Sequence, residues 1–305
     1  MDLAMTQYQQ VTVPVRGGDI AVGVWGPADA PHTVLAVHGV TSSHKSWPLL
    51  AAELPGARII APDLRGRGRS NRLPGPYGMP QHADDLADVL AALEVDQAVV
   101  VGHSMGAFVS VVLAHRHPEL VSELVLVDGG LPLAVPEGIA PDELTRAVLG
   151  PAQERLTMTF DSVESYLDFW RVHPAFGEGW TPVVEDYMAY DLDGEAPELH
   201  PATAFQAVAE DSAELTGSDS LVTALDNLRH RAMFLRAPRG LLNAEPLYEA
   251  EYVAQWKSKL KTLTTMEVDD VNHYTIVLGD RGAGVVAGVV EDSFARNDSK
   301  AGSKA

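Results

Sequence analysis

The stretch Val99-Val100-Val101-Gly102-His103-Ser104-Met105-Gly106 decides the fold of this chain. It contains the pattern Gly-x-Ser-x-Gly, follows an apolar run typical of a β-strand, and precedes a helical pattern over residues 107–115. A serine at such a sharp strand-to-helix turn has a strained backbone and projects its hydroxyl beyond the sheet. Gly102 and Gly106 leave room for the strand and the helix to approach closely. The stretch therefore predicts Ser104 as a candidate nucleophile at the tip of this turn.

Two further segments stand in the order that this turn requires. His38-Gly39 follows the apolar run 33–37, and Pro-Asp-Leu-Arg-Gly-Arg-Gly-Arg-Ser at 62–70 follows the run 58–61. Together with the serine turn, these segments resemble the α/β-hydrolase fold over nearly the whole chain. The resemblance implies a mostly parallel twisted sheet with helices on both faces and an inserted helical cap.

The hydrophobic pattern agrees with an α/β protein. Alternating apolar residues over 11–25, interrupted by Arg16-Gly17-Gly18-Asp19, predict a β-hairpin. Short apolar runs then alternate with helical patterns, which is typical of a parallel sheet covered on both faces. The expected strands are 33–37, 58–61, 97–101, 123–127, 232–237 and 264–268, and the expected helices lie near 45–54 and at 80–93, 105–116, 246–260 and 280–294.

A long segment in the second half breaks this alternation. No strand-like run occurs between about residues 131 and 228, where prolines separate the helical patterns 156–160, 163–172 and 183–190. We interpret 131–228 as the cap, inserted into an α/β core made of 1–130 and 229–294. The tail 295–305 is small and polar, and we expect it to be disordered. Aromatic residues concentrate in the cap, and the predicted substrate contacts are Phe176, Trp180 and Tyr187.

Composition narrows the class of protein. The chain has 305 residues, no cysteine and a formal net charge of −20. The lack of cysteine excludes disulfides and thiol catalysis, and the negative charge disfavours nucleic acid and anionic membranes as partners. The N-terminus lacks the pattern of a secretory signal and no apolar run approaches about 20 residues, so we expect a cytoplasmic protein without a membrane segment. A homodimer stays open because no motif fixes the oligomeric state.

A serine nucleophile needs a base and a group that orients the base. In the fold that this chain resembles, the acid and then the histidine follow the serine in the sequence. His273 is the predicted base, because it follows the last expected strand and precedes an apolar segment, as the fold requires. The other histidines after Ser104 lie in the next helix, in the cap or ahead of a strand: His115, His117, His173, His200 and His230.

The position of the acid is open between two sites. Most relatives of this fold carry it after the strand expected at 232–237, in a pattern Gly-x-x-Asp, but here the pattern reads Gly240-Leu241-Leu242-Asn243. Asparagine cannot supply the charge that stabilises an imidazolium. We therefore favour Asp128, at the end of the strand beside the serine strand, with Glu245 as the alternative. Two aspartates nearer to His273 in the sequence are weaker alternatives, Asp269 and Asp270.

The oxyanion formed during acyl transfer needs donors that are fixed before the charge develops. The resemblance implies the N–H of Met105, which follows the nucleophile, and the His-Gly-x pattern points to the N–H of Val40. His38 then has a structural role. No residues have the spacing of a metal site and no phosphate-binding glycine loop follows a strand, so we expect neither a metal nor a cofactor.

A serine rather than an aspartate at the turn excludes the epoxide hydrolases and dehalogenases of this fold. The serine, an acid at the position of Asp128 and an aromatic cap resemble the zearalenone (mycotoxin) lactonases and their bacterial relatives. That resemblance implies hydrolysis of a small-molecule lactone or aryl ester through an acyl-enzyme. A C–C bond hydrolase, a peptidase, a perhydrolase and a small-molecule receptor without turnover stay open as alternatives.

Overall fold

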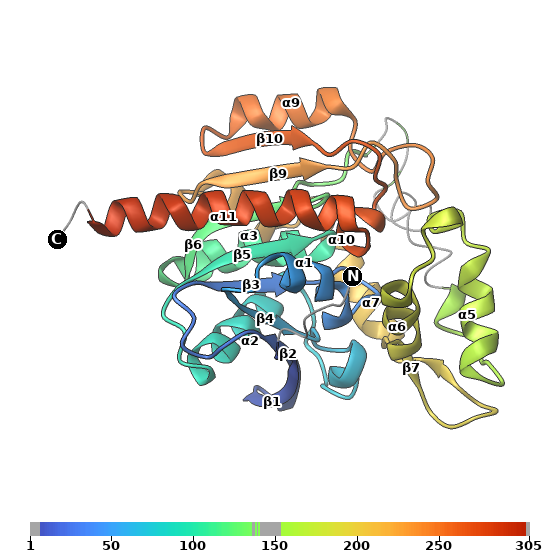
Figure 1. Cartoon of the computed structure of the whole chain (residues 1–305). Coiled ribbons are helices and arrows are strands. Elements are labelled where there is room, and N and C mark those ends of the chain that lie inside the picture. The colour runs from blue at the N-terminus through green and yellow to red at the C-terminus, as the bar shows by residue number, and fades with distance from the viewer. Residues whose placement is uncertain (1–6, 136–137, 139, 141–153, 303–305) are drawn as a thin grey trace.

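The computed structural model describes residues 7–135, 138, 140 and 154–302. Its centre is an eight-stranded sheet with the order β1-β2-β4-β3-β5-β6-β9-β10 (Figure 1). The strands from β4 to β10 pair in parallel, and the antiparallel strands β2 and β1 extend one edge. The strands are β1 (Gln9–Val15), β2 (Gly18–Trp25), β3 (Thr33–Val37), β4 (Arg58–Pro62), β5 (Ala98–His103), β6 (Val121–Val127), β9 (Ala232–Arg236) and β10 (Leu263–Glu267).

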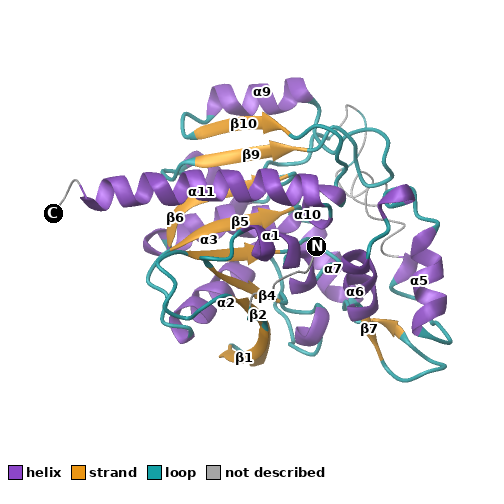
Figure 2. Cartoon of the chain, in the orientation of Figure 1, coloured by secondary structure: helices purple, strands orange, loops and turns teal. Residues whose placement is uncertain are grey.

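Helices cover both faces of the sheet (Figure 2). One face packs against α1 (Pro48–Glu53), α10 (Thr275–Leu278) and α11 (Asp280–Gly302). The other packs against α2 (Met79–Ala92), α3 (Met105–Arg116), α8 (Asp219–Asp226) and α9 (Ala250–Lys259). Among the residues that the structure describes, no helix combines the length and the apolar character needed to cross a bilayer.

The side chains of β5 alternate between the two cores. Val100 belongs to the core that contains Phe108 of α3, whereas Val99 and Val101 belong to the core that contains Val286 of α11. Because both faces of the strand are covered, its side chains form a continuous apolar run rather than an alternating one. This central, fully buried strand gives the serine turn a rigid base.

The sequence predicts most of the core correctly. The hairpin expected over 11–25 is formed by β1 and β2, and the helix expected at 105–116 is α3 with the same bounds. The strand expected at 33–37 is β3 with the same bounds, and the other core elements shift by a few residues at their ends, except α11, which extends beyond the expected 294 to Gly302. Both findings follow from patterns that are local in the sequence, where the hydrophobic period changes from that of a strand to that of a helix.

Most of the described elements between β6 and β9 lie beyond the carboxyl ends of the parallel strands, towards which their arrows point (Figure 1). Its described elements are α5 (Val163–Arg171), α6 (Pro182–Tyr190), β7 (Leu192–Asp193), β8 (His200–Pro201), α7 (Phe205–Ser212) and α8. The helices expected at 163–172 and 183–190 are thus present as α5 and α6. The last helix, α8, packs against α3 and shares its core, so the segment returns to the α/β core before residue 228.

Two details of this segment contradict the sequence prediction. Residues 156–160 form a turn and a bridge instead of a helix, because Phe160 pairs in an antiparallel bridge with Leu199 and buries its ring against Tyr166. β7 and β8 form a short hairpin where no strand is expected. The bridge and the hairpin both pair residues that are not neighbours in the sequence, so the hydrophobic pattern of each short segment does not predict them.

The prediction of a disordered tail from residue 295 is wrong as far as Gly302, because α11 continues without a break to that residue. Arg296 explains the difference. Its Nη2 lies 2.8 Å from the Glu123 carboxylate on β6, a side chain that is only 4% exposed. A buried carboxylate needs a charged or hydrogen-bonding partner, and here the polar tail supplies it.

Candidate active site

Ser104 sits on a strained turn between β5 and α3. Its φ of 53° and ψ of −126° are unusual for a residue other than glycine. The glycines of the motif permit this geometry: a Cβ on Gly106 would lie 2.1 Å from the Val37 carbonyl oxygen, and one on Gly102 would lie 2.5 Å from Ala107 Cα. The turn therefore matches the strand-turn-helix geometry that the sequence predicts around Ser104.

His273 and Asp128 meet beside this turn. The His273 ring is buried, and its Nδ1 donates to Asp128 Oδ2 over 2.7 Å. Asp128 follows the end of β6 and is completely buried, and its other oxygen accepts from the Ala237 N–H at 3.1 Å. The carboxylate is thus held at both oxygens. A histidine fixed in this way presents Nε2 for proton transfer.

The alternative acids Glu245, Asp269 and Asp270 are all exposed, and His273 is paired with none of them. Asn243 uses its side-chain oxygen to accept from Asn272 Nδ2 at 3.1 Å. The loop after β9 therefore contributes no carboxylate to His273 among the described residues. Of the candidate acids, Asp128 is the one that the structure brings to the histidine.

Two more buried histidines hold the site in place. His103 Nε2 donates to the main-chain carbonyl of His273 at 2.8 Å, which ties the histidine loop to the end of β5. Burial, and then the nearby His273, hold the pKa of His103 well below its usual range. His38 accepts from the Leu64 N–H through Nε2 and contacts the Gly39 carbonyl through Nδ1. Both histidines are therefore neutral structural groups.

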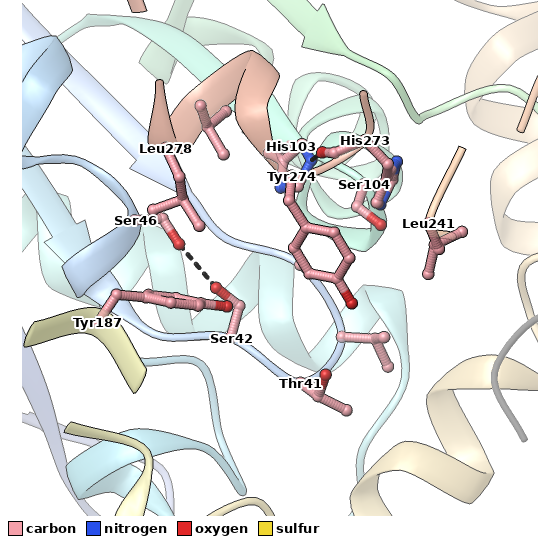
Figure 3. Close-up of a pocket in the computed structure, with 13 residues that line it drawn as sticks. Thr41, Ser42, Ser46, His103, Ser104, Tyr187, Leu241, His273, Tyr274 and Leu278 are labelled. Atoms are coloured by element: carbon pink, nitrogen blue, oxygen red, sulfur yellow. Dashed lines mark hydrogen bonds between the residues drawn. The ribbon is translucent and has the colours of Figure 1, made fainter. Parts of the chain in front are cut away.

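Ser104 and His273 open into a pocket of about 470 Å³, including its mouth, which we call the serine pocket. Figure 3 shows Ser104 next to His273, with the ring of Tyr274 close to both. Ser42 and Ser46, which are joined by a hydrogen bond of 2.7 Å, contribute hydroxyl groups to the pocket wall. The serine pocket is lined by Gly39, Val40, Thr41, Ser42, Ser46, His103, Ser104, Tyr187, Leu241, His273, Tyr274, Val277 and Leu278.

A second space, which we call the apolar chamber, also reaches Ser104 and His273. Its remaining lining is entirely apolar, consisting of Val40, Met105, Phe108, Leu133, Leu215, Leu241 and Leu247. Ser104 therefore lies between a pocket that several hydroxyl groups help to line and a chamber lined otherwise by hydrocarbon side chains. A small molecule bound across both spaces would place its middle at Ser104 Oγ.

Both residues predicted to hold the oxyanion line this junction. Val40 and Met105 are buried, and within the described part of the chain neither N–H donates to a protein acceptor. Met105 is also the first residue of α3, where the helix dipole favours negative charge. The two amides are thus available beside Ser104.

The predicted cap aromatics divide into two groups. Tyr187 lines the serine pocket, whereas Phe176 and Trp180 are absent from its lining and pack against each other. Phe176 lies 5.2 Å from Tyr274, centroid to centroid, and supports that ring from outside the pocket. The sequence did not predict Tyr274 as a pocket residue, although its position directly after His273 is an indication that it lies near the site.

Within the described residues, no group of three or more histidine, aspartate or glutamate side chains is arranged to hold a metal ion.

Comparisons with known proteins show similarity over part of the sequence and over the fold. Residues 32–165 match the family described as alpha/beta hydrolase fold. The chain is 42% identical over 119 residues to Lipase LipV of Mycobacterium tuberculosis, covering 38% of this chain and 43% of that protein. It is 36% identical over 143 residues to the bifunctional esterase/perhydrolase DCH of Acinetobacter calcoaceticus, covering 46% of this chain and 51% of that protein. The matched part thus spans about half or less of these relatives.

Solved structures extend the likeness over nearly the whole chain. The structure of E-2-(acetamidomethylene)succinate hydrolase has a TM-score of 0.76 and covers 95% of this chain and 100% of its own, at 21% identity. At such low identity the likeness concerns the fold and says nothing of the substrate. The chain therefore has the alpha/beta hydrolase fold, with esterases and lipases among its homologues.

Proposed function

We propose that this protein hydrolyses carboxylic esters through an acyl-enzyme on Ser104. The observation that carries the proposal is the His273–Asp128 hydrogen bond beside the pocket that Ser104 lines. In the proposed reaction, His273 takes the serine proton as Oγ attacks the carbonyl carbon, and Asp128 stabilises the imidazolium. The Val40 and Met105 N–H groups hold the oxyanion. His273 then protonates the leaving alcohol, activates a water molecule, and the acid is released.

The two spaces beside Ser104 support a finer proposal for the substrate. The apolar chamber suits a hydrocarbon part, and the serine pocket, with Ser42, Ser46 and Tyr187, suits a part that carries hydroxyl groups. A lactone such as zearalenone combines a hydrocarbon ring with phenolic hydroxyls, which are the two kinds of group that these spaces suit. We therefore keep the lactonase function as the specific form of the proposal.

Perhydrolysis is a second candidate, favoured by the similarity to the esterase/perhydrolase of Acinetobacter calcoaceticus. In that reaction, hydrogen peroxide replaces water as the group that attacks the acyl-enzyme. The product is a peracid, and Ser104 is set free with its proton. The same residues would serve both reactions.

The test is a panel of p-nitrophenyl esters with acyl chains of two to eight carbons, followed by simple lactones and zearalenone. Wild type is compared with Ser104→Ala, and Ser258→Ala serves as a control because Ser258 lies on α9, exposed and outside the site. We expect turnover of the esters, loss of kcat by at least about 10³-fold in Ser104→Ala, and no change in the control. Parallel assays with hydrogen peroxide measure peracid formation.

The outcomes separate the levels of the proposal. Ester turnover that survives in Ser104→Ala would contradict the proposed mechanism. Turnover of esters without opening of any lactone would keep the esterase function and overturn the lactonase function. Binding of zearalenone, measured by calorimetry, without turnover of any substrate would favour a receptor.

A further inference from the structure

Arg67 touches both residues that are proposed to hold the oxyanion. Its side chain is fully buried in the loop after β4. Nε donates to the Val40 carbonyl at 2.9 Å, and Nη2 lies 3.7 Å from the Met105 sulfur. Nη1 donates to the Arg65 carbonyl at 2.9 Å, which fixes the guanidinium against its own loop. A planar guanidinium can hold several acceptors in one rigid arrangement.

The same guanidinium is paired with a carboxylate from the segment over the strand ends. Asp211 of α7 is fully buried, and its Oδ2 lies 2.5 Å from Arg67 Nη1 and 2.9 Å from His82 Nε2. Its Oδ1 accepts from the Gly78 N–H at 2.6 Å. Burial opposes the charge of Asp211, but Arg67 and His82 hold its pKa well below the usual range. The pair is therefore ionised and fully coordinated.

α7 is also seated directly on the loop that carries Arg67. The Ala204 N–H donates to the Gly66 carbonyl at 2.8 Å. Gly66 has a φ of 81°, and a Cβ there would lie 2.6 Å from the Ala207 Cβ. The position of α7 and the position of the guanidinium are thus set by the same contacts.

We propose that Arg67 is a positioning residue that, anchored by Asp211, holds the Val40 and Met105 amides in the geometry that binds the oxyanion. The carbonyl that Arg67 holds belongs to Val40, one peptide unit from the donor N–H, and the sulfur that it touches belongs to the second donor residue. The role rests on the proposed function of the site. It predicts an effect on the transition state rather than on substrate binding, because oxyanion donors act where charge develops.

The experiment compares two buried arginine–aspartate pairs from the same loop. The test variant is Arg67→Met with Asp211→Asn, which removes both charges and leaves neither unpaired. The matched control is Arg65→Met with Asp85→Asn, because that pair is equally buried, with 2.7 Å between Arg65 Nη2 and Asp85 Oδ1, and touches neither donor residue. Arg67→Lys is added as a milder variant that keeps the charge opposite Asp211 but loses the fork.

Four quantities are measured for each folded variant. They are kcat and KM on p-nitrophenyl butyrate, the affinity for a trifluoromethyl ketone, which forms a tetrahedral adduct on the serine, and the affinity for butyramide, a ground-state ligand. We expect the test variant and Arg67→Lys to lose at least about tenfold in kcat and in ketone affinity, with KM and butyramide affinity unchanged. The control pair is expected to keep its kcat within about twofold.

Equal losses in the test and control pairs would overturn the proposal, as would parallel losses of ketone and butyramide affinity. If wild type does not turn over esters, or Ser104→Ala remains active, the proposed function fails and this role fails with it. If Ser104→Ala is inactive and the Arg67 variants match the control, only the role of Arg67 is rejected.

Discussion

Asp128 combines an unusual backbone with a carboxylate held at both oxygens. Its φ is 47°, its Oδ1 accepts from Ala237 and its Oδ2 accepts from His273. An asparagine there would present an amide N–H to His273 Nδ1, and the ring would then carry its proton on Nε2. We expect Asp128→Asn to lower kcat by about 10⁴-fold in steady-state ester assays. Glu245→Gln is the control, and a comparable loss in that variant would contradict the assignment.

A second prediction at the scale of one residue concerns the effect of His38 on the pH dependence of stability. Burial lowers its pKa to about 4, against the opposing charge of Asp63, whereas the unfolded chain binds a proton near pH 6.5. The contribution of His38 to the free energy of unfolding is therefore fully present above pH 6.5 and falls by about 3 kcal/mol as the pH is lowered to 4. Urea titrations between pH 7 and 4.5 should show a shallower decline for His38→Gln. Coincident curves would contradict the neutral state.

At the scale of elements, an ion pair joins the C-terminal part of α11 to the central sheet. Glu123 of β6 is 4% exposed and receives Arg296, while Arg231 and Lys300 lie farther away at 4.0 and 3.8 Å. We expect Arg296→Ala to lower the free energy of unfolding by about 1–3 kcal/mol, because it leaves a buried carboxylate poorly paired. Adding Glu123→Gln should restore most of that loss, as measured by urea unfolding.

The control for this prediction is an exposed pair. Lys259 and Asp226 lie 3.3 Å apart with both side chains about half exposed. Lys259→Ala should therefore change the stability by less than about 0.5 kcal/mol. If Lys259→Ala and Arg296→Ala lower the free energy of unfolding by the same amount, the burial of Glu123 does not determine how strongly its ion pair attaches α11.

At the scale of the whole molecule, polar contacts attach the segment over the strand ends to the α/β core. Tyr190 at the end of α6 donates to Asp63 Oδ2 at 2.8 Å, and Asn71 Nδ2 donates to Asp193 at 2.7 Å. Asp63 also accepts from His44 and from the Arg69 N–H, so it keeps partners when Tyr190 is changed. The attachment can therefore be weakened without unfolding the core.

We expect Tyr190→Phe to speed amide hydrogen exchange in α6 by about fivefold, the factor that corresponds to one lost hydrogen bond of about 1 kcal/mol. Exchange in β5 should stay unchanged. Tyr252→Phe is the control, because its hydroxyl donates to Pro132 on another side of the segment. Faster exchange throughout the sheet would show instead that Tyr190 stabilises the fold as a whole.

The sequence by itself determined the features that depend on neighbours along the chain. The serine turn, the hairpin and α3 follow from local patterns of glycine and apolar residues, and His273 follows from its place after the last strand. The comparisons and the sheet order confirm the fold class that these patterns predict. Their physical basis is the backbone and the hydrophobic period, which act over a few residues.

Tertiary structure alone decided which distant groups meet. It brought Asp128 to His273 across 145 residues, and it left Glu245 in solvent. It placed Tyr187 rather than Trp180 in the lining of the serine pocket, and it paired Arg296 of the polar tail with Glu123. Each of these contacts joins elements that pack together only after the chain has folded, so no local pattern encodes them.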